Sequence, residues 1–105
     1  MVLLHILSNT QKQAEQIADF LIRENLLLEA TLQQQVMSRK KNESGTIEIS
    51  SKTLVTGKTK ALLFNEIEKT IKAHFKEQPP VIYATPIAYM DWEQSKQLVD
   101  GVAKI

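Results

Sequence analysis

The alternation of apolar and polar residues predicts two kinds of element in the first part of the chain. Residues 2–7 are a mostly apolar run rich in branched side chains, and residues 8–10 are polar, which is typical of a buried strand that ends in a turn. Thr10 and Gln13 have the spacing of a helix capping box, and apolar residues then recur every three or four positions. This pattern predicts a helix that begins at Thr10 and ends near Asn25.

A period of two replaces the helical pattern over residues 26–36, where apolar residues occupy most of the even positions. Alternation resumes over residues 46–57, so the two segments are expected to form a long hairpin that turns at residues 42–45. Between Ile49 and Leu54 the apolar positions change from odd to even, which predicts a bulge in the second strand.

The second half of the chain carries its own boundary signals. Thr59 can cap a second helix, and the proline pair that begins at Pro79 ends it. A short strand is expected over residues 81–84, and Asp91 can cap a final amphipathic helix. The apolar stripes of these helices are Leu63, Phe64, Ile67, Ile71 and Phe75 in the first and Trp92, Leu98, Val99 and Val102 in the last.

The predicted order of elements defines a fold class. Strand, helix, strand, strand, helix and strand, in that order, is the α+β, ferredoxin-like βαββαβ arrangement, in which an antiparallel sheet carries both main helices on one face. A C-terminal helix follows. With 105 residues and no linker, the chain is expected to form a single domain over residues 1–105.

The composition excludes several functional classes. The 13 basic and 12 acidic residues leave a formal net charge of +1, which gives little attraction for a polyanion, so no nucleic-acid partner is expected. The absence of cysteine excludes disulfides, thiol nucleophiles and cysteine-ligated metal sites. No apolar run approaches the roughly 18 residues of a membrane span, so a cytoplasmic protein without a membrane partner is expected.

The chain has two histidines, His5 and His74, and the second is the stronger metal-ligand candidate. His74 and Glu77 are three positions apart, so a continuing helix would place the imidazole and the carboxylate on one face. A third ligand would have to come from another element, such as Asp91, or from a neighbouring subunit. The alternative is that His74 only closes the helix, where its charged form interacts favourably with the helix dipole.

Motifs for catalysis are missing. No serine lies in a GxSxG pattern and no glycine-rich phosphate loop is present. Acylphosphatases share this order of elements, but Arg23 and Arg39 both lie outside the first strand–helix turn, where their phosphate loop carries an arginine. We therefore expect no enzymatic activity.

One stretch of sequence resembles the CutA family. Residues 74–82 read HFKEQPPVI, residues 85–87 read TPI and residues 89–92 read YMDW, and these runs are similar to the family patterns HPYExPEII, LPI and YLDW. Lys58 and Thr59 match the KT that precedes the family's second helix, and Gly45 lies where its hairpin glycine would be. The similarity spans nearly the whole chain.

The resemblance implies a ferredoxin-like fold similar to PII signalling proteins and a homotrimer built by sheet edges that meet around a threefold axis. It also implies a non-enzymatic binding or scaffold role in divalent-cation tolerance, with copper or another divalent metal at His74 and Glu77. Ile6 stands where the family has a cysteine proposed to bind copper, and Lys52 stands near an acidic position of the family.

Two other interpretations remain open at this point. In the first, the protein is a PII-like sensor in which a small anionic effector binds between subunits near Lys58, Arg39 and Lys40. The basic residues 39–41 also have a simpler role, because cations on an exposed hairpin keep it solvated and protect its edges. In the second, the chain is an enzyme of acylphosphatase type.

Overall fold

The computed structural model describes residues 1–104 and contains seven regular helices and strands with one short 3₁₀ turn. In chain order these are β1 (Val2–Ser8), α1 (Gln11–Arg23), β2 (Thr31–Lys41), β3 (Ile47–Thr59), the 3₁₀ turn η1 (Ala61–Leu63), α2 (Phe64–His74), β4 (Val81–Pro86) and α3 (Trp92–Gly101). The strands form one sheet in the order β2-β3-β1-β4, and every neighbouring pair is antiparallel. The α+β, ferredoxin-like fold with a C-terminal helix is therefore confirmed.

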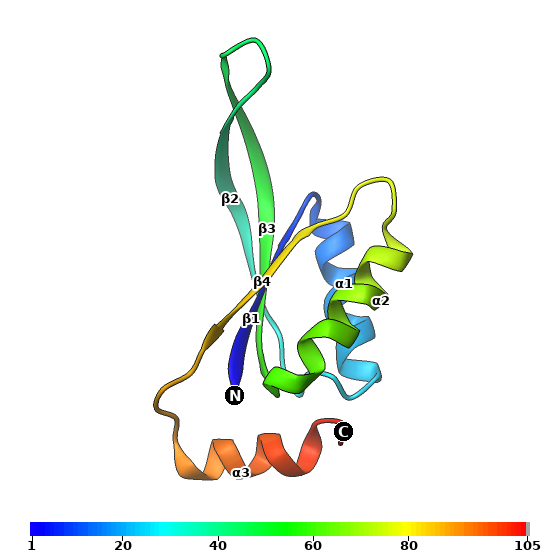
Figure 1. Cartoon of the computed structure of the whole chain (residues 1–105), viewed down its shortest axis with the longest axis vertical. Coiled ribbons are helices and arrows are strands. Elements are labelled where there is room, and N and C mark those ends of the chain that lie inside the picture. The colour runs from blue at the N-terminus through cyan, green and yellow to red at the C-terminus, as the bar shows by residue number, and fades with distance from the viewer. Residues whose placement is uncertain (105) are drawn as a thin grey trace.

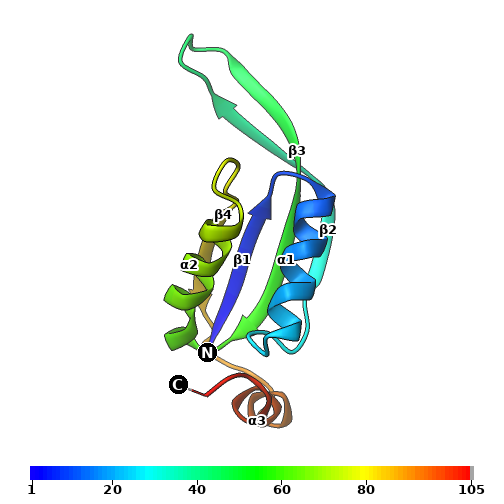
Figure 2. The ribbon, with the colours of Figure 1, turned by 90° about the vertical axis from the view of Figure 1, so that its right-hand side faces the viewer.

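Both long helices lie on the same face of the sheet, as Figure 2 shows. Side chains alternate between the two faces of a strand, so only every second residue meets the helices. In β1 these are Leu4, Ile6 and Ser8, which are fully buried, and Val55 of β3 lies beside Ile6. The opposite face carries no helix over the centre of the sheet, and it is called the open face below.

The start of α1 follows the predicted capping pattern. The Gln13 amide donates to the Thr10 hydroxyl at 3.0 Å. The Gln13 side chain reaches back one residue further than in a standard capping box and accepts from the Asn9 amide at 2.8 Å. Asn25, with a φ of 57°, ends this segment in the left-handed region that favours a sharp change of direction.

The second strand begins later than the alternation predicted. Residues 26–30 connect α1 to β2, and the strand starts at Thr31. Leu26 and Leu27 are buried from within this connection, because Leu27 lies over Gly57 of β3. A Cβ on Gly57 would stand 2.8 Å from a Leu27 methyl carbon and 3.0 Å from the Glu29 carbonyl oxygen, so a side chain there would crowd the connecting loop. The apolar spacing therefore reflected burial of a loop and not the pleat of a strand.

The predicted turn of the β2–β3 hairpin is confirmed, and the hairpin extends well beyond the helices (Figure 1). Gly45 has a φ of 87°, and the Asn42 side chain accepts hydrogen bonds from the Thr46 amide at 2.9 Å and the Ser44 hydroxyl at 2.8 Å. The molecule is 49 Å long as a result.

The predicted bulge lies in the other strand of the hairpin. The register between β2 and β3 shifts between Gln33 and Val36, and Gln35 has a φ of 56°. The extra residue therefore belongs to β2, whereas β3 continues with its odd positions toward the helices from Thr53 to its end. Leu54 faces the open side of the sheet. Its apolar side chain made the alternation in the sequence shift from odd to even positions, although the strand itself contains no bulge there.

Two boundaries of the second helix also differ from the prediction. Thr59 is the last residue of β3 and caps no helix; its hydroxyl donates to the Leu26 carbonyl at 2.8 Å. Helix α2 ends at His74, well before the proline pair. At the last helix the predicted cap is confirmed, because Asp91 accepts from the Gln94 amide at 3.2 Å. Trp92, which was expected in the apolar stripe, is 79% exposed.

The core is expected to be sensitive to small changes in α2. Ile67→Ala removes a side chain that is 0% exposed, so it should lower the free energy of unfolding by about 2–5 kcal/mol. Leu62→Ala is the matched control: Leu62 is 76% exposed, and its loss should change the free energy by less than about 0.5 kcal/mol. Urea denaturation measures both, and equal effects would show that Ile67 does not belong to the core.

Candidate functional site

The segment that follows α2 is fastened to the start of α1 by side-chain amides. The Gln78 carbonyl accepts from Gln13 Nε2 at 2.9 Å and from Asn9 Nδ2 at 3.1 Å. Lys52 of β3 donates to Asn9 Oδ1 at 2.7 Å. Gln13 is 7% exposed, so its two side-chain bonds satisfy a buried amide. This network holds the segment after His74 against β1, α1 and β3.

The His74 ring is oriented by its own helix. Its Nδ1 lies 2.9 Å from the Thr70 carbonyl oxygen. A carbonyl oxygen only accepts, so Nδ1 carries the hydrogen and Nε2 of the neutral ring keeps a free lone pair. The Phe20 ring lies 5.3 Å from the imidazole, centre to centre. A histidine whose second nitrogen is held by a carbonyl is the usual form of a metal ligand in proteins.

His74 and Glu77 line one cavity of about 490 Å³, although they do not share a helical face. Because α2 ends at His74, Glu77 belongs to the irregular segment that the Gln78 carbonyl anchors. The cavity lies between the start of α1 and the end of α2. Its lining consists of Thr10, Lys12, Gln13, Gln16, His74, Phe75, Lys76, Glu77 and Gln78.

The donors present meet only part of the needs of a metal ion. Within residues 1–104, no three histidine, cysteine, aspartate or glutamate residues lie close enough together to hold a metal. Transition metals bound by proteins take three or four such ligands. His74 and Glu77 of one chain can therefore supply part of a site only.

The two positions where the resemblance implied a ligand have structural roles instead. Ile6 is 0% exposed in the centre of the core. Lys52 donates to Asn9, which is one of the residues that anchor Gln78. Sequence reasoning missed this anchor, because Asn9 and Gln78 are 69 residues apart and no spacing relates them.

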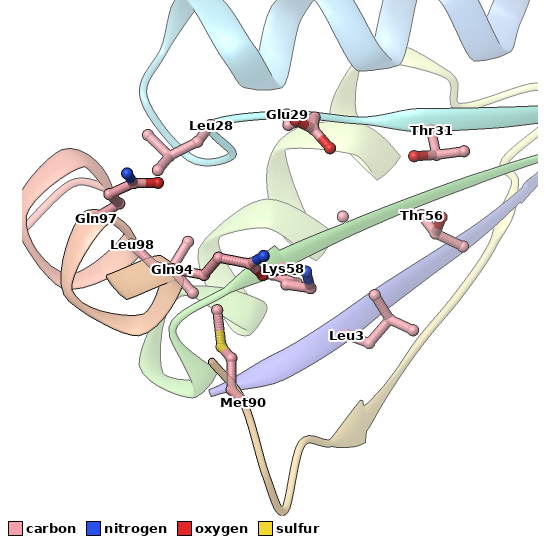
Figure 3. A pocket seen from close by; sticks show the side chains of 11 residues that line it. Leu3, Leu28, Glu29, Thr31, Thr56, Lys58, Met90, Gln94, Gln97 and Leu98 are labelled. Carbon is pink, nitrogen blue, oxygen red and sulfur yellow. Dashed lines mark hydrogen bonds between the residues drawn. The ribbon is translucent and has the colours of Figure 1, made fainter. Parts of the chain in front are cut away.

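The three predicted effector residues lie in two separate regions. Lys58 lines a cleft of about 450 Å³ between the sheet and α3, where its Nζ donates to Gln94 Oε1 at 3.3 Å (Figure 3). Arg39 pairs with Ile49, nine residues before Lys58 on β3. At about 3.4 Å per residue, Arg39 and Lys58 are roughly 30 Å apart. A site that uses both would need two chains, so the effector site stays a prediction.

The open face of the sheet carries large side chains that no element covers. His5 and Tyr83 stack at 4.6 Å with an angle of 5° between their rings, and His5 Nε2 lies 3.2 Å from the Thr85 hydroxyl. Tyr83 is 48% exposed and Val81 is 58% exposed. An apolar face of this kind usually marks an interface.

The overhanging hairpin exposes a second apolar surface. Met37, Ile47 and Ile49 are each more than half exposed, and they belong to the half of the β2–β3 hairpin that is nearer its turn. An exposed hydrophobic strand pair favours association unless another chain covers it. Within residues 1–104, no helix has the length and apolar character that crossing a membrane requires.

Comparison with known proteins gives a consistent family match. The family model described as CutA1 divalent ion tolerance protein matches residues 2–96. A direct comparison with curated protein sequences finds no match.

Several solved structures share the fold of this chain. CutA from Archaeoglobus fulgidus, described as a periplasmic divalent cation tolerance protein, is 25% identical, covers 98% of this chain and 100% of its own, and has a TM-score of 0.87. CutA1 from Pyrococcus horikoshii is 21% identical, with coverage of 99% and 100% and a TM-score of 0.87. CutA1 from Shewanella sp. SIB1, described as a stable protein, is 19% identical, with coverage of 98% and 95% and a TM-score of 0.89.

Proposed function

The chain belongs to the CutA1 divalent ion tolerance family, and on that premise we propose that it is a non-enzymatic, trimeric binding module that takes up copper or another divalent metal weakly at His74. The observation that carries the metal part is the orientation of the imidazole. Nδ1 is engaged by the Thr70 carbonyl, so Nε2 is available to a metal in the cavity that Glu77 also lines.

The small number of metal ligands in the cavity determines how tightly this site is expected to bind a metal ion. Imidazole and carboxylate are acceptable ligands for Cu(II), but one of each leaves positions for water or for groups from another subunit. Binding by two protein ligands at an exposed helix end should be weak and reversible. Such a site suits a protein that takes up excess metal without holding it permanently.

The trimer is supported by surfaces that one chain leaves uncovered. The open face around Tyr83 and the hairpin surface around Ile49 both carry exposed hydrophobic side chains. Strands β2 and β4 are the two edges of the sheet, and each can pair with another chain. Closed threefold pairing would cover both kinds of surface, whereas open pairing would lead to aggregation.

The cytoplasmic location expected from the sequence is part of the same proposal. The similar Archaeoglobus fulgidus protein is described as periplasmic, so the location has to be measured for this chain. Cell fractionation followed by immunoblotting tests it, and recovery in the periplasmic fraction would overturn it.

The assembly is tested by mass. Light scattering after size exclusion should give three copies of the 11.9 kDa chain, about 36 kDa in total, at micromolar concentration. Tyr83→Asp should reduce this mass, because it places a charge on the open face that the trimer would bury. Leu62→Asp, a charge on an exposed residue away from that face, is the control and should leave the trimer intact. A wild-type mass near 11.9 kDa would refute the assembly.

The metal site is tested by titration of Cu(II) into three variants. His74→Ala should weaken binding by at least about tenfold. Mutating a residue that only orients a metal ligand already lowers metal affinity by about tenfold or more, and His74 is proposed as a ligand itself. Glu77→Gln should weaken it less, and His5→Gln, which removes the other histidine, should leave it unchanged. Equal affinity of wild type and His74→Ala would remove His74 from the site.

The same binding should depend on pH in one direction. A metal binds only the neutral imidazole, so protons compete with it and affinity should fall when the solution is acidified from about pH 8 to about pH 5. Calorimetric titration at several pH values measures the change. Affinity that does not fall in acid would show that imidazole is not a ligand.

A further inference from the structure

A second cavity continues the one that His74 lines, on the face of the sheet opposite the open face. It has a volume of about 310 Å³ and lies between α1 and α2. Gln16, His74 and Phe75 line both cavities, so the two adjoin, and together they are called the helix groove below. None of its lining residues is among the exposed side chains, such as Tyr83 and Ile49, on which the proposed trimer rests.

The inner end of the helix groove is apolar. Ile17 and Ile71 form its floor, and Phe20 and Phe75 contribute two aromatic rings. Both rings pack against the core, so their positions are fixed by buried neighbours. An apolar cavity of about 150 Å³ is enough to bind benzene, so the inner end has room for a ring.

The outer end of the helix groove is polar and carries excess positive charge. Lys12 and Lys76 both line it, and Glu77 is its only acidic residue. Neither lysine forms an ion pair within residues 1–104, where the one recorded pair is Lys72 with Glu68. The Thr10 hydroxyl accepts from the Gln13 amide and keeps its own hydrogen to donate. Two cations and one carboxylate leave about one unit of positive charge for a ligand.

We propose that the helix groove binds a small amphipathic monoanion, namely a carboxylate joined by a short chain to an aromatic ring. The ring lies between Phe20 and Phe75, and the carboxylate lies near Lys12 and Lys76. The apolar end selects for the ring, because a polar group there would lose its hydrogen bonds with water. The lysines select for the charge, because hydrogen bonds to ionised groups are stronger than those between neutral groups.

This site differs from the proposed metal site in the groups that it uses. The metal needs the Nε2 lone pair of His74, whereas the anion is held by two lysines and an apolar slot. Anion binding is therefore measured with a chelator present, which removes any bound metal. The anion proposal can then fail or succeed whatever the result of the Cu(II) titration.

The experiment compares two probes of the same shape, 3-phenylpropionate and its neutral amide, 3-phenylpropionamide. The chain is labelled with ¹³C at the isoleucine methyl groups and titrated in the presence of a chelator. The carboxylate should bind saturably and shift the methyl signals of Ile17 and Ile71, which line the slot. The signals of Ile47 and Ile49 on the hairpin should stay in place. The amide should bind about tenfold more weakly, because it lacks the negative charge and one hydrogen bond to a charged group contributes about a factor of ten in affinity.

Charge variants on the surface complete the test without disturbing the core. The double variant Lys12→Gln, Lys76→Gln should weaken binding of the carboxylate by about tenfold. The double variant Lys69→Gln, Lys96→Gln removes the same charge from exposed positions elsewhere and should leave the affinity within about twofold. Four results would each overturn the proposal: no saturation, equal binding of the amide, equal effects of the two double variants, or shifts at Ile47 and Ile49 in place of Ile17 and Ile71.

Discussion

The one-sided cover of the sheet is the constraint on which the rest of the structure depends. Helices α1 and α2 pack on the same face, so β1 buries Leu4 and Ile6 and turns His5 toward the other side. Because successive side chains of a strand point in opposite directions, each strand that builds the core also builds an outer surface. In this chain the outer surface carries the stacked His5 and Tyr83 rings. The fold therefore creates a second, outer surface wherever it creates a core.

A single backbone carbonyl, that of Gln78, holds the candidate site in place. The Gln78 carbonyl accepts from two side-chain amides at the start of α1, and this holds the chain in place after α2 has ended. His74 then faces a cavity between the two helices, and Glu77 lines the same cavity. Packing of α1 and α2 on one face of the sheet also leaves the apolar slot between them. The proposed metal site and the helix groove thus both depend on the same packing, although they use different chemistry.

Local interactions made much of the fold predictable. The Thr10 cap, the turn after Asn42 and the Asp91 cap each depend on residues within a few positions of one another, and the structure contains all three. The bulge was assigned to the wrong strand because Leu54 is apolar on a face without helices. The second strand begins later than predicted because Leu26 and Leu28, two even positions of the alternation, belong to the loop after α1. In both cases the position of an apolar residue along the chain did not show which surface its side chain meets.

The sequence by itself determined the order of the elements, the family and the identity of the candidate ligands, because these depend on composition, local spacing and motifs. It also indicated His74 and Glu77 as a pair. Only the tertiary structure decided their geometry: the helix ends between them, the imidazole is held by the Thr70 carbonyl, and both residues face one cavity. It likewise separated Lys58 from Arg39 by most of the length of a strand. A pattern along the chain records which residues share an element, whereas distances between elements are fixed by packing, which no local spacing contains.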